Sequence, residues 1–438
     1  MGHGSSSPQP FGDSRVVKTK FGNIIGRRFV FDKKEESNSI DAFQVDAFQG
    51  IPYASPPVGA LRFKKPEWPQ PWSDVKSTKK FAARGVQKDL HCFEKIKLGE
   101  ISEDNLYLNV FTPVWSPDPD SEGFAVLVFI HGGAFICDSA VKYGDVGICE
   151  HLCTKDVVVV TIQYRLGFLG FFSTGDEHCP GNFGLWDQTL ALKWIQENIA
   201  AFNGDPGNVT VMGQSAGGAC MIDALRKLPF SKFALSLMDN TGKSSLEKCC
   251  PVGPRLDFDF IPKSVSELRK EASAKPMLIG CCASEGLLFL GFERNYCVGK
   301  IMEYVSLVVP EKEYPRMFKR YREEIFQKLL SDPENSEEVA RGSVEIFGDL
   351  LMNVAVQTAV QETLESHDAP VYFYSYDYCN PKSWEPLSSR WPFIDATHCT
   401  ELTYIFAVGN NWDFEFNDND KRMLELTTRM WTNFAKYG

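Results

Sequence analysis

NVTVMGQSAGGAC, residues 208–220, joins an apolar run typical of a buried β-strand to the pentapeptide GQSAG at residues 213–217. A serine that follows a strand directly, with a glycine two residues away on each side, is typical of a nucleophile elbow, a tight turn from a strand into a helix. A serine hydroxyl is a poor nucleophile at neutral pH, so the turn has to present it where a histidine can reach the Oγ atom. The bare GxSxG pattern also occurs by chance in ordinary Gly/Ser turns, but its position after a strand favours Ser215 as a nucleophile.

The chain around this motif alternates strand-like runs with helical stretches. Five runs are rich in apolar and β-branched residues: 125–130, 156–164, 208–213, 276–281 and 370–376. Their continuous apolar character indicates strands covered on both faces. Between the second and third runs, apolar residues of 184–202 fit a helix packed on the sheet, which gives a βαβ unit. The sequence therefore predicts an α/β fold, with a mostly parallel sheet and helices on both faces, in one domain over residues 15–438.

A second glycine motif follows the run at 125–130. The segment HGGAF at residues 131–135 is an HGGG-type loop, which supplies backbone N–H groups to an oxyanion hole. In a tetrahedral intermediate the former carbonyl oxygen is negatively charged, and each fixed N–H donor stabilises it by about 3 kcal/mol. A simple turn that closes a strand is the alternative interpretation. Together with the elbow, the motif favours acyl-transfer chemistry.

An orienting acid and then a histidine base have to follow the serine in this type of fold. Two histidines lie downstream: His367, in a polar stretch before a strand, is typical of a solvated loop, whereas His398 precedes an apolar helical pattern. The acid is expected at Glu285, because the run at 276–281 delivers it to the same carboxyl edge of the sheet. Asp395 is the alternative acid.

Composition limits the class of protein and its partners. Hydrophobic residues make up 43% of the 438 positions, and no apolar run approaches the 18 or so residues of a membrane span, so we expect no transmembrane segment. The net charge of −11 disfavours nucleic acid and other polyanions, and is compatible with a small neutral or cationic substrate.

The 13 cysteines show no CxxC…CxxC spacing for a metal ion. Cys149, His151 and Cys153 form one compact trio, but Ile148 and Leu152 beside them indicate the inner face of a helix. We therefore expect a packed helix there rather than a zinc site, and neither a metal nor a cofactor elsewhere.

Residues 1–14 are predicted to form a disordered N-terminal tail. The tail lacks the apolar core of a secretory signal, so we expect a cytoplasmic protein whose cysteines are free thiols. Its start, MGHGSS, fits the N-myristoylation pattern at Gly2, although a chance glycine in a flexible tail gives the same pattern. One myristoyl chain alone binds membranes marginally, so any membrane association is expected to be weak.

The motifs together resemble the type-B carboxylesterase and cholinesterase family, from about Val17 to the end of the chain. The stretches that carry this resemblance are FQGIPYASPPVGALRFKKP (48–66), SEDNLYLNVFTP (102–113), HGGAF (131–135), QYRLGFLGFF (163–172), GNFGLWDQTLALKWIQENIAAFNGDPGNVTVMGQSAGG (181–218) and MWTNFAKYG (430–438). The resemblance implies the α/β-hydrolase fold. It also implies carboxylesterase activity on a small-molecule ester.

The same resemblance implies a catalytic triad of Ser215 as nucleophile, Glu285 as acid and His398 as base. It further implies three oxyanion donors, the N–H groups of Gly133, Ala134 and Ala216. Ala134 stands where many family members have glycine, which keeps the N–H donor but adds a methyl group beside the acyl pocket.

Two departures from the family bear on location and substrate. The family's first disulfide joins two cysteines at positions where this chain has Gly85 and Asn105, and this paired loss favours a reducing compartment. Cholinesterases have a glutamate just before the nucleophile and a tryptophan shortly before SEDCLYLN, where this chain has Gln214 and residues 91–101, HCFEKIKLGEI. Without that anionic neighbour and that cation–π face, choline esters are not expected to be preferred over uncharged ones.

A third departure follows the elbow directly. Family members have a further strand and helix there, whereas here only 70 residues separate Ser215 from Glu285. The chain also stops before the family's usual C-terminal strand and helix. We therefore expect an α/β-hydrolase fold that lacks one internal strand–helix segment and the C-terminal end. The strand at 276–281 then either slides inward and displaces Glu285, or leaves the sheet open, unless LPFSKFALSLMDN at residues 228–240 rebuilds the missing strand.

These observations leave two functional hypotheses. The first is an ester hydrolase that acts on uncharged esters through a Ser-His-Glu triad and an acyl-enzyme intermediate. The alternative is a catalytically impaired or inactive family member, a splice form or binding protein, because the deletion lies beside the nucleophile.

Overall fold

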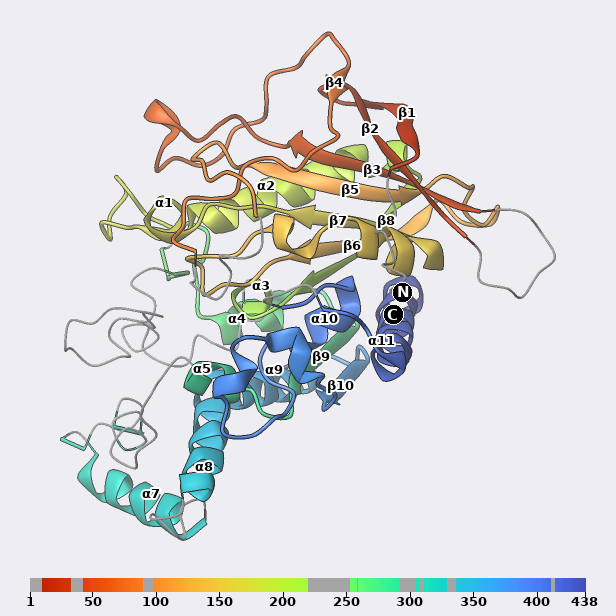
Figure 1. The fold of residues 1–438 in the computed structure, drawn as a ribbon. Helices are drawn as coiled ribbons and strands as arrows, with labels where there is room; N and C mark the ends of the chain where they lie inside the picture. Colours follow the sequence, from red (N-terminus) through yellow and green to blue (C-terminus); the bar gives the residue numbers. More distant parts are fainter. Residues whose placement is uncertain are drawn as a thin grey trace.

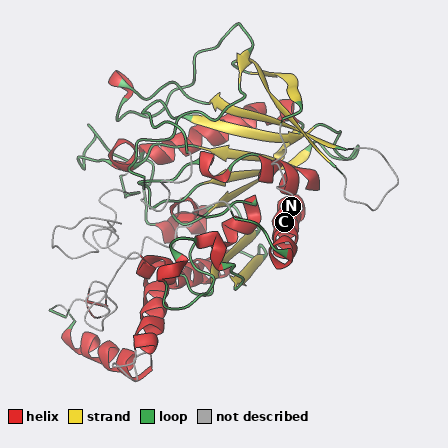
Figure 2. Ribbon diagram, viewed as in Figure 1, coloured by secondary structure: helices red, strands yellow, loops and turns green. Residues whose placement is uncertain are grey.

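The structure, a computed structural model, describes residues 10–32, 42–89, 98–219, 253–257, 259–291, 302, 305–306, 311–312, 314–328, 336–410 and 414–438. Helices cover both faces of the central sheet (Figures 1 and 2), as the sequence predicts, and the sheet itself is mixed, with antiparallel ladders beside the parallel ones. Gly2 lies outside the described residues, so its predicted modification stays a prediction.

The described strands are β1 (Gly12–Thr19), β2 (Gly22–Phe31), β3 (Phe43–Pro52), β4 (Lys76–Ser77), β5 (Tyr107–Pro113), β6 (Phe124–Ile130), β7 (Val157–Ile162), β8 (Gly204–Gly213), β9 (Met277–Cys282) and β10 (Val371–Tyr376). The central sheet has the order β1-β2-β3-β5-β7-β6-β8, with β4 beside β2. β6 pairs in parallel with β7 and β8. The pairs β1–β2, β2–β3, β3–β5 and β5–β7 are antiparallel. The five runs predicted from the sequence are β6 to β10, so those strand predictions are confirmed.

The described α-helices are α1 (Gly167–Phe171), α2 (Phe183–Asn198), α3 (Ala216–Ala219), α4 (Val265–Glu271), α5 (Leu287–Gly291), α7 (Pro315–Lys328), α8 (Ser336–Gly348), α9 (Val354–Ser366), α10 (Thr400–Phe406) and α11 (Asp418–Tyr437). Successive side chains of β6 point to opposite faces of the sheet, and each face has its own core. Val126 and Val128 share a cluster with Trp194 of α2. Ala125 and Phe129 belong to a second cluster, which includes residues of α10 and α11.

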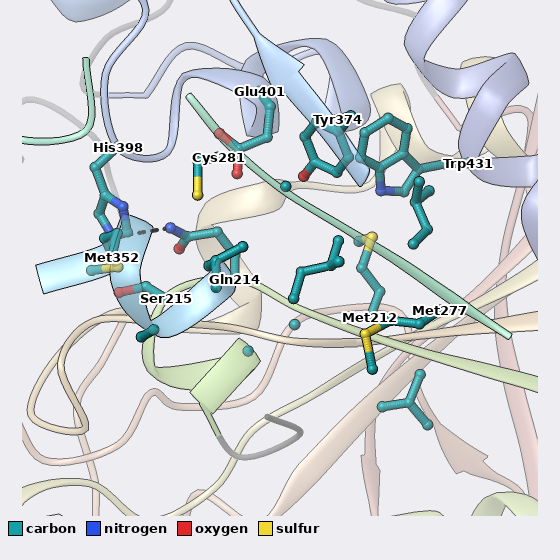
Figure 3. Close-up of a pocket in the computed structure, with 18 of the residues that line it drawn as sticks. Met212, Gln214, Ser215, Met277, Cys281, Met352, Tyr374, His398, Glu401 and Trp431 are labelled. Atoms are coloured by element: carbon teal, nitrogen blue, oxygen red, sulfur yellow. Dashed lines mark hydrogen bonds between the residues drawn. The ribbon is translucent and has the colours of Figure 1, made fainter. Parts of the chain in front are cut away.

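The central sheet ends at β8 within the described chain. β9 instead forms a separate parallel pair with β10, in register from Met277 to Cys282. A cavity of about 220 Å³ lies between the two edges, lined by Met212 of β8 and Met277 of β9 (Figure 3). The strand at 276–281 has therefore not slid inward against β8, and no described strand fills the place of the missing one. Residues 228–240, the segment that could rebuild it, lie outside the described residues.

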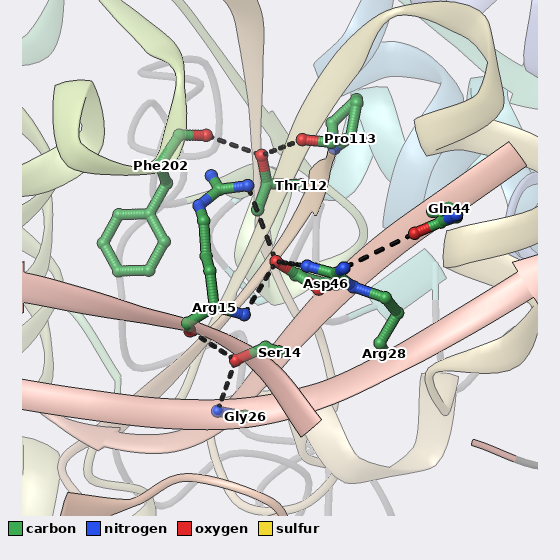
Figure 4. Close-up of polar contacts among 9 residues, drawn as sticks. All are labelled: Ser14, Arg15, Gly26, Arg28, Gln44, Asp46, Thr112, Pro113 and Phe202. Carbon is green, nitrogen blue, oxygen red and sulfur yellow. Dashed lines mark hydrogen bonds and ion pairs between the residues drawn. The ribbon is translucent and has the colours of Figure 1, made fainter. Parts of the chain in front are cut away.

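A buried carboxylate holds the N-terminal strands together (Figure 4). Asp46 on β3 has no exposed surface and accepts hydrogen bonds from Arg28 Nε at 2.7 Å and Arg28 Nη2 at 3.1 Å. Arg15 Nη1 on β1 reaches the same carboxylate at 3.5 Å. Ser14 Oγ accepts the N–H of Gly26 at 2.7 Å. β1 thus begins at Gly12, before the predicted domain start at residue 15, and is fixed onto the sheet by polar contacts as well as by its ladder.

The open edge of β8 predicts a deficit in stability. A six-residue strand placed between β8 and β9 would pair with main-chain groups of both, and at about 1 kcal/mol for each net hydrogen bond it would add roughly 5 kcal/mol to the free energy of unfolding. We expect a chain that carries the strand–helix segment of a full-length family member after Cys220 to melt at a higher temperature in a calorimetric scan.

A glycine–serine insertion of the same length is the control for this experiment, because it has no apolar side chains to fill the cavity. It should not raise the melting temperature. If the 438-residue chain melted as cooperatively and at as high a temperature as the version with the strand, the open edge would carry no cost.

Candidate active site

Ser215 occupies the turn between β8 and α3. Its φ of +54° lies in the left-handed region, which costs a residue with a side chain about 1–2 kcal/mol. Glycines make this turn possible, because a Cβ atom at Gly217 would clash with the carbonyl oxygen of Ile130, and one at Gly213 with that of Gly217. The elbow predicted from GQSAG is therefore present, packed against the end of β6.

The loop at residues 131–135 lies directly against this elbow. A Cβ atom at Gly132 would stand only 2.9 Å from Ser215 Cβ. The loop is held from behind by Tyr164, whose hydroxyl donates to the carbonyl oxygen of His131 at 2.9 Å and whose ring stacks on the imidazole of His131. The sequence thus brings its two glycine motifs together at one edge of the sheet.

The predicted oxyanion donors lie on these two segments. Gly133 has φ +92° and Ala134 has φ +53°, so the alanine adopts a left-handed conformation that favours glycine. Ala216 is the first residue of α3, and its N–H therefore has no acceptor inside the helix. The chain has kept the shape of the loop although a methyl group replaces a hydrogen at Ala134.

Glu285 and His398 form a buried pair. Glu285 Oε2 lies 2.6 Å from His398 Nδ1, and the two side chains are 7% and 8% exposed. Glu285 Oε1 accepts the N–H of Cys282 at 2.7 Å, which holds the carboxylate at the end of β9. Two further bonds join this turn to the histidine loop: Ser284 N–H to Ala396 O at 2.8 Å, and Leu288 N–H to Thr397 Oγ1 at 2.7 Å.

The two alternatives weighed from the sequence lie elsewhere. Asp395 accepts hydrogen bonds from Ser284 Oγ at 2.7 Å and from the N–H of Ala396 at 2.8 Å, and has no contact with His398 among the described residues. His367 follows the end of α9, where it is partly buried rather than solvated. Neither residue shares the acid–base pair.

Comparison with known proteins agrees with this geometry. The profile of the carboxylesterase family matches residues 13–233 and 220–438. The chain belongs to the carboxylesterase family. It is 35% identical to the esterase cest-33 of Caenorhabditis elegans, over 90% of this chain and 81% of that protein. It is 30% identical to the precursor of a medium-chain fatty acyl-CoA hydrolase of Anas platyrhynchos (96% and 84%) and 31% identical to the cocaine esterase of Homo sapiens (90% and 79%).

Membership of the carboxylesterase family confirms the predicted α/β-hydrolase fold and the predicted class of serine carboxylic ester hydrolase. The family match consists of two segments that overlap at residues 220–233, shortly after the elbow. The alignment with the C. elegans esterase spans 458 positions but uses 90% of the 438-residue chain, so it passes over several dozen positions where this chain has no residue. Both findings agree with a deletion after Ser215.

The carboxylesterase family's first disulfide is replaced here by packing. A Cβ atom at Gly85 would stand 2.8 Å from Asn105 Nδ2, so the two positions are neighbours in space. Asn105 is 2% exposed, and its Nδ2 donates to Tyr164 O at 3.4 Å. The asparagine side chain thus occupies the space that a disulfide between these positions would fill.

Gln214 is a contact of His398 that the sequence did not predict. Its Nε2 lies 3.1 Å from His398 Nε2, and the residue is 8% exposed (Figure 3). No hydrogen bond joins Ser215 to His398 in the described chain. The sequence offered one signal, because Gln214 stands where cholinesterases have a glutamate.

Glu401 is a second carboxylate at this site, also not singled out from the sequence. It lies three residues after His398, in the first turn of α10, and lines the cavity between β8 and β9. Its Oε2 accepts a hydrogen bond from Cys282 Sγ at 3.1 Å. Burial, and then the charge of Glu285, raise the pKa of the Glu401 carboxyl and favour its neutral form.

No metal site accompanies these residues. Among the described residues, no group of three or more His, Cys, Asp or Glu side chains could hold a metal ion. Cys149 and Cys153 are buried with Ile148 and Leu152 in a short helical segment, which confirms the predicted packed helix. None of the described helices is long and apolar enough to span a bilayer.

Opposing effects set the pKa of His398. Burial lowers it, but the Cys399 side chain and the Glu285 carboxylate raise it by more, so the pKa lies well above the ordinary value of about 6.5. A histidine base has to be neutral, so we expect ester hydrolysis to fall as the pH drops through this raised pKa, with a midpoint above 6.5 in a pH profile of kcat/KM.

Two carboxylate variants sharpen this prediction. Glu285→Gln removes the charge that orients His398, and we expect it to lower kcat by about 10³-fold or more. Asp395→Asn is the matched control, because Asp395 does not touch His398, and it should keep the midpoint of the wild type. If Asp395→Asn lowered kcat more than Glu285→Gln does, Asp395 rather than Glu285 would be the acid.

Proposed function

We propose that this chain hydrolyses uncharged carboxylic esters through an acyl-enzyme intermediate. Ser215 is the nucleophile, His398 the general base and acid, and Glu285 the acid that orients the imidazole. The observation that carries the proposal is the 2.6 Å contact between Glu285 and His398 beside a serine elbow against which the glycine loop is packed. These contacts support a site in which acid, base and nucleophile share one edge, although β8 and β9 do not pair.

The reaction follows from these positions. His398 Nε2 takes the proton of Ser215 as Oγ attacks the ester carbonyl, and the N–H groups of Gly133, Ala134 and Ala216 stabilise the resulting oxyanion. His398 then gives the proton to the departing alcohol. A water molecule, activated by the same nitrogen, releases the acid from Ser215. Glu285 holds Nδ1 protonated throughout and stabilises the imidazolium that forms.

The impaired family member remains the second candidate function. The open edge of β8 beside Ser215 favours it, and so does the Gln214 amide on His398 Nε2. The buried pair of Glu285 and His398 favours an active enzyme, because two ionisable side chains without a function would gain more from separate solvation than from burial.

We also propose that the protein works in the reducing environment of the cytoplasm, with weak membrane association if Gly2 is myristoylated. The exchange of the family's first disulfide for the contact between Gly85 and Asn105 supports the reducing environment. The eight cysteines among the described residues are all free thiols.

A fluorophosphonate probe tests the nucleophile. We expect it to label the wild type at Ser215, located by peptide mass spectrometry, because only a serine activated by a histidine reacts readily with it. Ser215→Ala should abolish both labelling and hydrolysis of p-nitrophenyl esters. Ser389→Ala changes an exposed serine and should behave as the wild type. Labelling that survives Ser215→Ala would remove Ser215 from its role, and a wild type that does not label would support the impaired alternative.

Substrate charge is the next prediction. Because the neutral Gln214 precedes the nucleophile, we expect butyrylcholine to be no better a substrate than its uncharged isostere 3,3-dimethylbutyl butyrate, compared by kcat/KM. Of residues 91–101, where cholinesterases have their tryptophan, 91–97 lie outside the described residues. Gln214→Glu restores a carboxylate and should raise the relative rate with the cation. A clear preference of the wild type for butyrylcholine would show that another side chain binds the ammonium group.

A further inference from the structure

The side chain of Gln214 competes for the atom that Ser215 needs. In the proposed reaction, His398 Nε2 has to accept the proton of Ser215 Oγ. In the structure Gln214 Nε2 stands 3.1 Å from that nitrogen, on a residue that is 8% exposed (Figure 3). Ser215 makes no hydrogen bond to His398 in the described part of the chain. The base therefore already has a partner, and it is not the nucleophile.

The direction of this hydrogen bond follows from the other side of the ring. Glu285 Oε2 lies 2.6 Å from Nδ1, and a carboxylate can only accept, so Nδ1 carries the proton. At a pH above the raised pKa of His398 the imidazole is neutral, and Nε2 then has a lone pair and no hydrogen. The Gln214 amide donates to that lone pair. His398 is thus held in the tautomer that catalysis needs, with its accepting position filled.

Gln214 also has space into which it can withdraw. The side chain lines the cavity of about 220 Å³ between β8 and β9, together with Ser215, His398 and Met352. Its Oε1 accepts no hydrogen bond from the described residues. A rotation of the amide into the cavity breaks only the contact with His398 Nε2.

We propose that Gln214 is a positioning residue that holds His398 Nε2 in the resting enzyme, and that its withdrawal into the cavity frees this nitrogen for Ser215. The inference rests on the proposed ester-hydrolase function. It assigns the cavity a role in the same reaction, as the space that receives the displaced amide. An ordinary intramolecular hydrogen bond corresponds to a factor of about 2–10 in an equilibrium constant, so removal of the contact should increase the rate by about that factor.

The test compares two variants that lose the contact in different ways. Gln214→Met keeps the length of the side chain but cannot donate, and Gln214→Asn keeps the amide but is one methylene shorter. We expect both to increase the second-order rate constant of fluorophosphonate labelling at Ser215 by about 2–10-fold. The kcat for p-nitrophenyl butyrate should rise with it, while KM stays unchanged, because the substrate is not bound more tightly.

Ser389→Ala is the control, because it changes an exposed side chain that does not line the cavity, and its labelling rate should equal that of the wild type. Thermal unfolding of each variant shows whether it has folded. The inference would be overturned if Gln214→Met and Gln214→Asn both fold and label Ser215 at the wild-type rate or more slowly. The ester-hydrolase proposal would then still stand. If neither wild type nor variants label, the proposed function fails and the inference fails with it. Labelling of the variants but not of the wild type supports the inference most strongly.

Discussion

The hydrogen bond between Glu285 and His398 lies beside the gap between the described strands β8 and β9, and the geometry of the site depends on it. Ser215 follows β8 and Glu285 follows β9, but these strands do not pair within the described chain. Their relative position is set from outside the sheet. Trp431 of α11 belongs to the core on one face of the central sheet and also packs edge-on against Tyr374 of β10, with ring centroids 5.2 Å apart. Packing of α11 against both parts thus takes the place of a shared ladder. It keeps the turn that carries Glu285 next to His398.

Local features of this carboxylesterase could be predicted because each rests on neighbouring residues. The strands β6 to β10 follow from short apolar runs, and the elbow follows from two glycines that leave no room for a Cβ atom. The sequence favoured Glu285 over Asp395 as the acid. In the structure Glu285 is hydrogen-bonded to His398, whereas Asp395 is bonded to Ser284. The early start of β1 was missed because the tail appears polar in sequence, whereas Ser14 and Arg15 are hydrogen-bonded to partners on β2 and β3.

The fate of the gap could not be predicted, because it is decided by competing long-range interactions. Sliding β9 inward by one strand spacing of about 4.8 Å would pair the main-chain groups of β8, but it would also pull Glu285 away from His398. It would further break the two hydrogen bonds that tie the turn after β9 to residues 396 and 397. The buried acid–base pair, those bonds and the packing of Tyr374 on Trp431 outweigh a new ladder. Glu285 therefore stays on His398, and β8 has no second neighbour among the described strands.

The charge balance at the site explains why a neutral amide suits position 214. Glu285 and Glu401 already lie near His398, and the pKa of Glu401 is raised by burial and by the charge of Glu285. A glutamate at position 214 would place a third carboxylate on the same cavity, where each further negative charge costs more because little water screens it. It would also favour the imidazolium over the neutral base. A glutamine fills the same volume, donates to the neutral ring and adds no charge. His398 therefore keeps the tautomer that Glu285 selects, and its proton affinity is not raised further.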